Sequence, residues 1–206
     1  MENNIIKIDN SKIHEAATLL TLAFEKGSGI SMICHTENNE LLRRRLYLIF
    51  VASISLHIAA NQPILGLTKD EHLIGIAILE EPEISLPVGS QIKYFSKVIL
   101  RINPLITWRL LRNIQILASY QSSDAHHLTF LGIHPQFQGQ GYGRILLEKI
   151  HSLSNNYPKP SGIYLETGNS NNVSFYQHFG YHVNAQIKLG KIETFIMFRP
   201  NSFTKK

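Results

Sequence analysis

The chain has 206 residues, of which 44% are hydrophobic and 17% charged, and these proportions exclude a disordered chain. A chain of this length can bury a full hydrophobic core, and we expect a single domain over residues 1–206. The formal charge of +5 comes without a recognisable nucleic-acid-binding module, so we expect no nucleic-acid partner.

Three features of the sequence bear on the compartment. Cys34 is the only cysteine, which excludes an internal disulfide framework and fits a reducing compartment. Met1–Lys12 contains no basic-then-apolar run of the kind found in secretory signals. The longest apolar stretch, Leu46–Ala60, is interrupted by polar residues and is too short to span a bilayer. We therefore expect a cytoplasmic protein without a membrane span.

The first part of the chain alternates short apolar runs with segments of helical periodicity. A strand is expected at Ile5–Ile8, followed by a helix that Ser11 caps and that carries Ile13, Ala16, Leu20 and Phe24 on one face. A second helix is expected over residues 39–60. The runs Ile64–Thr68 and His72–Leu79 then predict an antiparallel hairpin.

A basic segment follows the hairpin. Residues 84–123 contain no acidic side chain but include Lys93, Lys97, Arg101, Arg109 and Arg112. We interpret residues 88–122 as a helical insertion with two helices that separate near Asn103-Pro104, because proline is poorly tolerated inside a helix. Its charge favours either steering of anionic ligands or a plain solvated surface, and both interpretations stay open.

The next stretch combines a strand, a glycine-rich loop and a helix. Leu128–Ile133 predicts a buried strand that ends at the His134-Pro135 turn, and a helix is expected from Arg144 onward. Gly139, Gly141 and Gly143 lie at the start of that helix. The first amides of a helix lack internal partners and lie at the positive end of the helix dipole. This loop is therefore expected to bind a phosphate group.

The remaining elements complete the sheet. A strand at Ile163–Thr167 should run parallel to Leu128–Ile133, because a helix connects the two. A short helix then carries Val173, Tyr176 and Phe179, Gly180 is expected in a left-handed C-terminal cap, and the runs 181–189 and 192–199 predict a final hairpin.

Two types of nucleotide-binding site are alternative interpretations of the loop that contains Gly139, Gly141 and Gly143. A Walker-type site needs a lysine and a hydroxyl residue at the helix start, and neither is present. A dinucleotide site needs Gly-x-Gly-x-x-Gly and a later acid. Here the spacing is Gly-x-Gly-x-Gly, and although Glu166 ends the next strand, the further strand–helix units of a doubly wound sheet are missing.

A third interpretation is a resemblance to a known family. The run Gln138-Gly-Gln-Gly141-Tyr-Gly143 resembles the signature of GCN5-related N-acetyltransferases (GNAT), and Asn169-x6-Tyr176-x3-Gly180-Tyr181 is similar to their second motif. The segment from Leu165 to Tyr176 looks most like the branch that contains puromycin N-acetyltransferase. The resemblance implies an α/β (α+β) GNAT fold, with a mixed, mostly antiparallel sheet, a parallel and splayed pair of fourth and fifth strands, and flanking helices.

The resemblance also implies acetyl-CoA as the co-substrate and assigns residues to it. The expected contacts lie on the strand edge, on the loop, and after the fifth strand: Leu131, Gly132, Ile133, Gln138, Gly139, Gln140, Gly141, Tyr142, Gly143, Arg144, Asn169, Asn172 and Tyr176. Asn169 and Asn172 can equally cap the helix that follows. No metal is expected, because the ten histidines form no His-Glu-x-x-His motif.

For catalysis, the resemblance implies that Tyr176 protonates the departing thiolate, a role that the phenol's ordinary pKa of about 10 allows. The attacking amine also needs a base. Our first candidate is Glu166, and the spacing does not separate it from Glu80, Glu81, His126 and His127. Cys34 matches no motif, so direct attack on the thioester is expected.

The expected acceptor is a primary amine of a small molecule or a peptide. Aromatic residues near the pocket favour an apolar amine, whereas the basic run favours an acidic one, and the two signals disagree. The alternative function is a non-catalytic CoA-binding or protein-interaction module that uses the insertion at 88–122. Oligomeric state cannot be predicted from these patterns.

Overall fold

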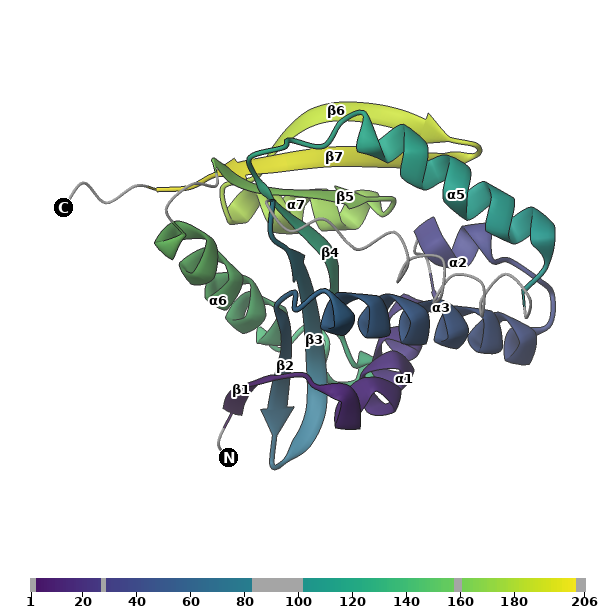
Figure 1. Cartoon of the computed structure of the whole chain (residues 1–206), viewed down its shortest axis with the longest axis horizontal. Helices are drawn as coiled ribbons and strands as arrows, with labels where there is room; N and C mark the ends of the chain where they lie inside the picture. Colours follow the sequence, from purple (N-terminus) through teal and green to yellow (C-terminus); the bar gives the residue numbers. More distant parts are fainter. Residues whose placement is uncertain (1–2, 27–28, 83–101, 158–160, 203–206) are drawn as a thin grey trace.

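The computed structural model describes residues 3–26, 29–82, 102–157 and 161–202. The strands in these ranges are β1 (Asn3–Lys7), β2 (Ile64–Lys69), β3 (His72–Glu80), β4 (His126–Ile133), β5 (Gly162–Thr167), β6 (His182–Leu189) and β7 (Ile192–Pro200). They form one sheet in the order β1-β2-β3-β4-β5-β7-β6 (Figure 1). Among the described strands only β4 and β5 are parallel, so the predicted mixed, mostly antiparallel sheet is confirmed.

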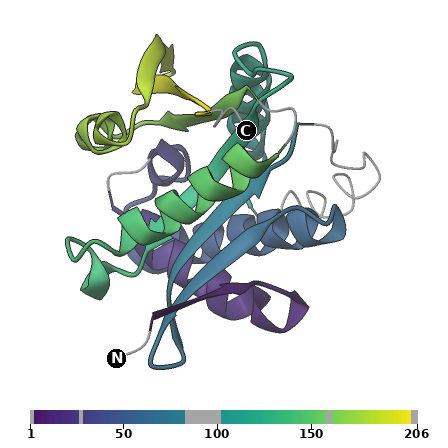
Figure 2. The same cartoon turned by 90° about the vertical axis from the view of Figure 1, so that its left-hand side faces the viewer.

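Helices cover both faces of this sheet. They are α1 (Ile13–Phe24), α2 (Gly29–Ile33), α3 (Asn39–Ala59), α5 (Pro104–Ala118), α6 (Tyr142–Asn156) and α7 (Ser170–His178), with 3-10 turns at Asn10–Lys12 and Pro135–Phe137. α1 and α3 lie on one face of the sheet and α6 on the other (Figures 1 and 2). No helix in the described ranges combines the length and hydrophobicity needed to cross a bilayer.

Two hydrophobic cores result from this arrangement. Phe50 and Ile54 of α3 pack with Ile76 and Ile78 of β3 in one core. The core on the α6 side joins three apolar residues of that helix to the three strands β3, β4 and β5: Leu146, Leu147 and Ile150 with Ala77, Leu79, Leu128, Ile163 and Leu165. Because the side chains of a strand alternate between faces, burial of both faces explains why β3 is apolar at almost every position.

Some predicted boundaries are wrong in detail. Asp9, and not Ser11, caps the N-terminal helical segment, because its carboxylate accepts a hydrogen bond from the Ser11 amide at 2.9 Å. The helix α6 begins at Tyr142 rather than Arg144, after Gly141 in a left-handed conformation (φ +84°). The short helix α2 has no counterpart among the predicted elements.

Of the expected helical insertion at residues 88–122, the structure describes only residues 102–122. Asn103 caps α5 through a hydrogen bond from the Leu105 amide at 2.9 Å, and Pro104 occupies the first helical turn, as the Asn-Pro pair predicts. The helix expected before it, with Lys93, Lys97 and Arg101, lies outside the described residues.

The separation of β4 from β5 positions the candidate site. The two strands pair only at His126–Ile163 and His127–Tyr164. The pairing between β3 and β4 shifts register at Ile78/Leu79, so that Thr129 is an extra residue in β4 opposite that point. A bulge of this kind bends a strand, and from Thr129 onward β4 leaves β5.

Candidate active site

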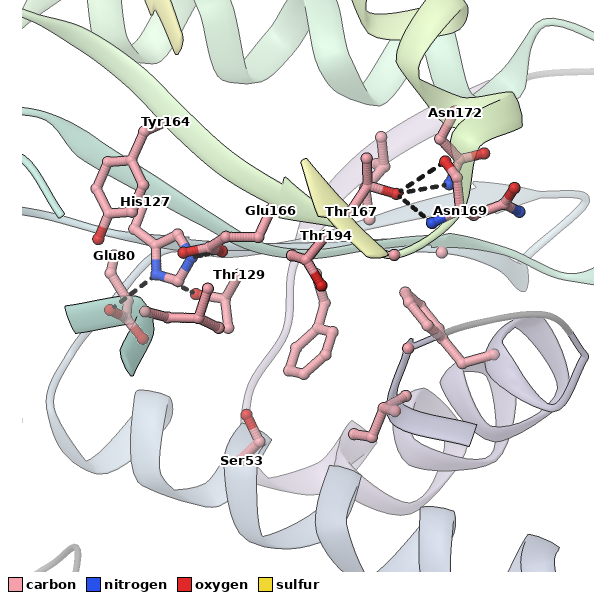
Figure 3. A pocket seen from close by; sticks show the side chains of 18 of the residues that line it. Ser53, Glu80, His127, Thr129, Tyr164, Glu166, Thr167, Asn169, Asn172 and Thr194 are labelled. Carbon is pink, nitrogen blue, oxygen red and sulfur yellow. Dashed lines mark hydrogen bonds and ion pairs between the residues drawn. The ribbon is translucent and has the colours of Figure 1, made fainter. Parts of the chain in front are cut away.

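A cavity of about 1530 Å³ lies where β4 and β5 separate. Its lining includes every residue expected from the sequence to contact a ligand or take part in catalysis, except Gln140 and the base candidate His126. Figure 3 shows Glu80, His127 and Glu166 toward one end and the group Thr167, Asn169 and Asn172 toward the other. Sites for one small ligand usually measure about 300–1000 Å³, so this cavity is large enough for two ligands.

The glycine loop presents unpaired backbone amides to the cavity. Within the loop, the Gln138 amide donates to the Pro135 carbonyl at 3.4 Å and the Arg144 amide to the Gly141 carbonyl at 3.1 Å. Between them, the amides of residues 139–143 have no acceptor among the described residues. A Cβ added to Gly139 or Gly141 would meet no atom within 4 Å, so the space on the side-chain side of these two residues is open. The loop can therefore receive an anionic group.

The polar side chains of the loop maintain its shape. The Gln138 side chain donates to the Ile133 carbonyl at 2.9 Å, and the Gln140 side chain donates to the Gln136 carbonyl at 3.0 Å. Arg144 forms an exposed ion pair with Glu148 at 2.7 Å. The loop thus offers mainly its backbone to a ligand, while these side chains bind within the loop and the following helix.

The edge of β4 beyond His127 also presents amides that have no acceptor in the described part of the chain. The His134 amide points toward β3, since it donates to the Ile74 carbonyl at 2.9 Å. Amides alternate in direction along a strand, so those of Ile133 and Leu131 point away from β3, toward the side that β5 has left. Gly132 has a different role, because a Cβ there would lie 2.8 Å from Leu20 of α1. Its lack of a side chain allows α1 to pack closely on β4.

At the start of α7, both asparagines act as local structural groups. The Asn169 side chain caps α7 by accepting from the Asn171 amide at 3.0 Å. The Thr167 hydroxyl accepts from the Asn169 amide at 3.2 Å and from the Asn172 side chain at 3.5 Å. The capping interpretation of Asn169 is therefore confirmed, and both side chains also line the cavity.

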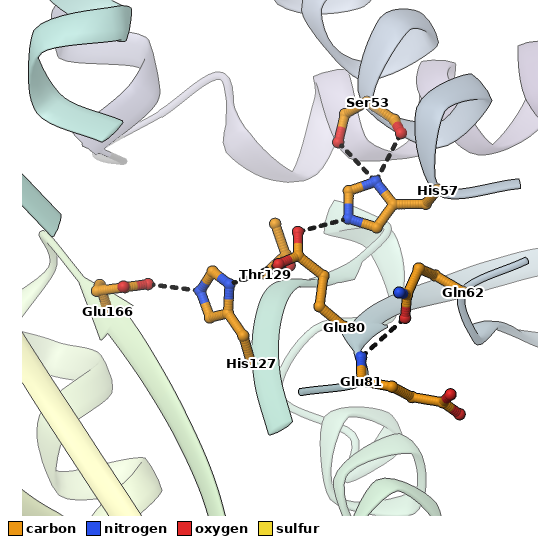
Figure 4. A network of polar contacts seen from close by, with 8 residues as sticks. All are labelled: Ser53, His57, Gln62, Glu80, Glu81, His127, Thr129 and Glu166. Atoms are coloured by element: carbon orange, nitrogen blue, oxygen red, sulfur yellow. Dashed lines mark hydrogen bonds and ion pairs between the residues drawn. The ribbon is translucent and has the colours of Figure 1, made fainter. Parts of the chain in front are cut away.

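A chain of hydrogen bonds connects α3 to β5 across the cavity wall (Figure 4). His57 Nδ1 lies 2.7 Å from the Ser53 carbonyl oxygen, and His57 Nε2 lies 2.8 Å from Glu80 Oε1. His127 lies between Glu80 Oε2, at 3.4 Å from Nδ1, and Glu166 Oε2, at 2.8 Å from Nε2. Three of the five base candidates therefore meet in one network, together with His57, which the sequence interpretation missed.

The charges in this network follow from its contacts. Burial alone would lower the pKa of His127, but the charges and hydrogen bonds of Glu166 and Glu80 outweigh it and raise that pKa to about 10. Burial alone would raise the pKa of Glu80, but its hydrogen bonds to His127 and His57 lower it below its usual range. His127 is thus an imidazolium at neutral pH, and its ring stacks on Tyr164 at 4.5 Å. A cationic His127 cannot act as the base.

Removing this imidazolium should destabilise the protein in a pH-dependent way. Because folding raises the pKa of His127 from 6.5 to about 10, its stabilising effect is complete below pH 6.5 and is lost as the pH rises through 10. We expect His127→Gln to lower the free energy of unfolding by about 3 kcal/mol at pH 6, since two partly buried carboxylates lose their shared partner. Urea unfolding at pH 6 and pH 10 measures this effect. A deficit that is equal at both pH values would contradict the assigned charge.

The other two base candidates have different surroundings. His126 lies on the α6 side of the sheet, within 3.0 Å of the Ser154 hydroxyl, and burial lowers its pKa to about 4. Glu81 accepts a hydrogen bond from the Tyr157 hydroxyl at 2.9 Å. His126 does not line the cavity. Strand alternation places His126 and His127 on opposite faces, so only His127 can reach the network.

Two further side chains bear on the chemistry. Tyr176 is 8% exposed, lines the cavity and packs against Phe175 and Tyr181, and burial raises the pKa of its phenol. Burial raises the pKa of Cys34 to about 12, and this thiol does not line the cavity. Among the described residues, no group of three His, Cys, Asp or Glu side chains has a geometry that could hold a metal ion.

Comparisons with known proteins agree with this geometry. Residues 108–183 match a family described as acetyltransferase (GNAT) domain. The fold resembles that of a Corynebacterium glutamicum protein described as histone acetyltransferase HPA2 and related acetyltransferase (15% identity, 100% of both chains, TM-score 0.67). It also resembles PaiA N-acetyltransferase from Thermoplasma acidophilum, solved with coenzyme A (14% identity, 97% of this chain and 99% of that one, TM-score 0.60).

A third similar structure is the ribosomal-protein-S18-alanine N-acetyltransferase of Escherichia coli (14% identity, 100% of this chain and 97% of that one, TM-score 0.56). At identities this low, the structural similarity shows a shared fold and does not identify a substrate. No curated protein sequence matches the chain. The matched residues run from α5 to the start of β6, and the chain shares its fold with these structures.

Proposed function

We propose that the chain is a GNAT acetyltransferase that moves an acetyl group from acetyl-CoA to a primary amine of a small molecule or a peptide. In this proposal residues 1–206 form one N-acetyltransferase domain with a helical insertion at about 88–122. The observation that carries it is one cavity that combines the open amides of residues 139–143 with the carboxylate–imidazole network. Because the segment Leu165–Tyr176 looks most like the branch that contains puromycin N-acetyltransferase, the proposal assigns the chain to that branch.

The proposed donor site runs along β4. The amides of residues 139–143 receive the pyrophosphate, and the free amides of Ile133 and Leu131 bind the pantetheine arm as an added strand. Asn169 and Asn172 line the same cavity from the start of α7. The open space in front of Gly139 and Gly141 supports this fit. A protein with the same fold has been solved with coenzyme A, which supports the same ligand here.

The proposed reaction needs two protein groups. The amine nitrogen bonds to the acetyl carbon and the carbon–sulfur bond breaks. Glu166 accepts one proton from the amine, and Tyr176 donates one proton to the departing sulfur. A second proton from the nitrogen returns to Tyr176 through solvent. An ammonium substrate and acetyl-CoA thus give the amide, the free CoA thiol and one proton.

Glu166 suits the role of base because of its position. Its side chain is 13% exposed and lines the cavity, and one of its oxygens accepts from His127. The cationic His127 keeps this carboxylate in place, while Glu80 and His57 maintain the orientation of His127. Tyr176 suits the role of acid because its phenol lines the cavity and keeps its proton throughout the neutral range, since burial raises its pKa further above neutral.

The donor site is tested by Gly141→Ala. Alanine at φ +84° is strained, so the free energy of unfolding should fall by about 1 kcal/mol. Its methyl group would also occupy the open space in front of the loop, so calorimetric titration should give an acetyl-CoA affinity at least about tenfold weaker.

The matched control for this variant is Gly180→Ala. Gly180 has the same φ of +84°, ends α7 and does not line the cavity. It should lose similar stability and keep the affinity for acetyl-CoA. Equal affinities for acetyl-CoA in both variants, or no binding to the unmodified protein at millimolar ligand, would contradict the proposed donor site.

A further inference from the structure

We infer that the acceptor is a hydrophobic primary amine whose nitrogen binds Glu166 and whose apolar body lies between α3 and α5. This inference rests on the proposed function and adds the substrate class. It is carried by two observations on the described residues: apolar side chains of two helices that line the cavity, and a carboxylate oxygen at the inner end of that cavity that lacks a protein partner.

The apolar part of the cavity is formed by facing helices. Ile49, Ala52 and Leu56 line it from α3, and Leu110, Leu111, Ile114 and Leu117 line it from α5. Leu111 and Ile114 remain 42% and 48% exposed although they face the cavity. Burying these side chains against an apolar ligand is favourable, at about 25 cal/mol for each Å² of apolar surface. An acceptor with an apolar body would provide that burial.

The polar end of the cavity selects an amine. Glu166 Oε2 accepts from His127, and Glu166 Oε1 has no partner among the described residues. A carboxylate accepts several hydrogen bonds, so this oxygen can accept one from an ammonium group. His57 and His127 are the histidines that line the cavity within the described ranges, and all four of their ring nitrogens already have partners. An acidic acceptor would find no free imidazole donor beside Glu166.

The basic side chains of α5 do not alter this selection. Arg109 and Arg112 do not line the cavity, and the Arg112 guanidinium lies over the Trp108 ring at 5.5 Å. The described part of the basic run therefore lies outside the acceptor site. Of the two conflicting signals of the sequence, the described residues thus favour the apolar amine.

The positions of donor and acceptor agree with each other. In the proposed donor site the pantetheine arm follows β4 from Ile133. Its thioester end lies toward Thr129, where β4 and β5 converge. Glu166 and His127 lie at that point of convergence, and Ser53 projects toward the cavity from α3 (Figure 3). An amine bound to Glu166 would therefore be next to the acetyl group, with its apolar body directed away from CoA.

A series of amines tests the inference. With acetyl-CoA saturating, kcat/KM is measured for n-butylamine, n-hexylamine and n-octylamine, and for spermidine, glutamate and a peptide with a free N-terminus. Each buried methylene can contribute up to about fourfold, so kcat/KM should rise at least about tenfold from n-butylamine to n-octylamine. The polar and peptide amines should fall below n-octylamine.

Two double variants locate the apolar site. Leu111→Ser with Ile114→Ser changes two exposed residues that line the cavity, so the protein should still fold. It should lower kcat/KM for n-octylamine about tenfold and for n-butylamine by no more than about twofold. The control is Leu105→Ser with Trp108→Ser, two residues of the same helix that are 52% and 55% exposed and do not line the cavity. This control should leave both values unchanged.

The outcomes separate this inference from the proposed function. Transfer that favours spermidine, glutamate or the peptide, or that is independent of chain length, would overturn the inference and leave the acetyltransferase function intact. If no amine is acetylated, the proposed acetyltransferase function is contradicted. Calorimetric titration with n-octylamine then tests the apolar amine site separately. Binding that the Leu111/Ile114 variant weakens would support an apolar amine site, and no binding would overturn it.

Discussion

Replacing Glu166 by glutamine is expected to lower kcat about 10²–10⁴-fold at pH 7, the range for removal of a general base. Glutamine keeps the shape of the side chain and an oxygen that accepts from His127, so the network should persist without its proton acceptor. In the variant, kcat should rise with pH as more of the amine is already deprotonated in solution. The measurement is a pH profile of kcat for both proteins, with acetyl-CoA affinity determined in parallel.

A structural role for Glu166 predicts a different pattern. If the carboxylate only supports His127, Glu166→Gln should lower stability and acetyl-CoA affinity together and leave the shape of the pH profile unchanged. A fall in kcat of less than about fivefold would also exclude Glu166 as the base. Glu81→Gln is the matched control, because Glu81 accepts from Tyr157 and is not part of the network. It should retain kcat within about twofold.

Tyr176→Phe is expected to lower kcat about 10²-fold while leaving the affinity for acetyl-CoA within about twofold. The change removes only the hydroxyl, and the phenyl ring keeps its packing against Phe175 and Tyr181. Loss of a positioned acid slows departure of the thiolate but not binding of the thioester. Steady-state kinetics and calorimetric titration together measure the two effects.

The control is the same deletion at a neighbouring tyrosine. Tyr181 is 1% exposed, lies within hydrogen-bond distance of His151 (3.2 Å) and does not line the cavity. Tyr181→Phe should lower stability by about 1 kcal/mol, the contribution of a typical hydrogen bond, and leave kcat nearly unchanged. If Tyr176→Phe lowers kcat and acetyl-CoA affinity to the same extent, Tyr176 is not the acid.

Local patterns account for most of the fold. The helix between Leu128–Ile133 and Ile163–Thr167 required those strands to be parallel, and they are. The predicted start of α6 is two residues too late. A glycine cap has no side chain that would mark the helix start in the sequence, and φ at Gly141 depends on the loop. Asp9 and Ser11 are both good capping residues, so local preference alone could not choose between them.

The site was predictable in part. The glycine spacing located the loop amides, because a helix start after a strand has a fixed chemistry. The point where β4 leaves β5 depends on the extra residue at Thr129, which no composition or period reveals. Strand alternation alone could have separated His126 from His127, since neighbours on a strand point to opposite faces.

The network could not be found from spacing. His57 and Glu80 are 23 positions apart, and His127 and Glu166 are 39 positions apart. In the sequence, His57 is a polar interruption of an apolar helix, and its partner comes from the end of β3. Only the packing of α3 against the sheet brings these side chains together.

The most direct test of the proposed function is transfer of a labelled acetyl group. The unmodified protein is incubated with acetyl-CoA that carries ¹³C in the acetyl group and with n-octylamine, spermidine, glutamate or a peptide with a free N-terminus. The proposed function predicts one labelled acetyl group on an amine nitrogen for each CoA thiol released. Bound acetyl-CoA with no acetylated amine from any of the four would contradict the proposed transfer and favour the non-catalytic CoA-binding module.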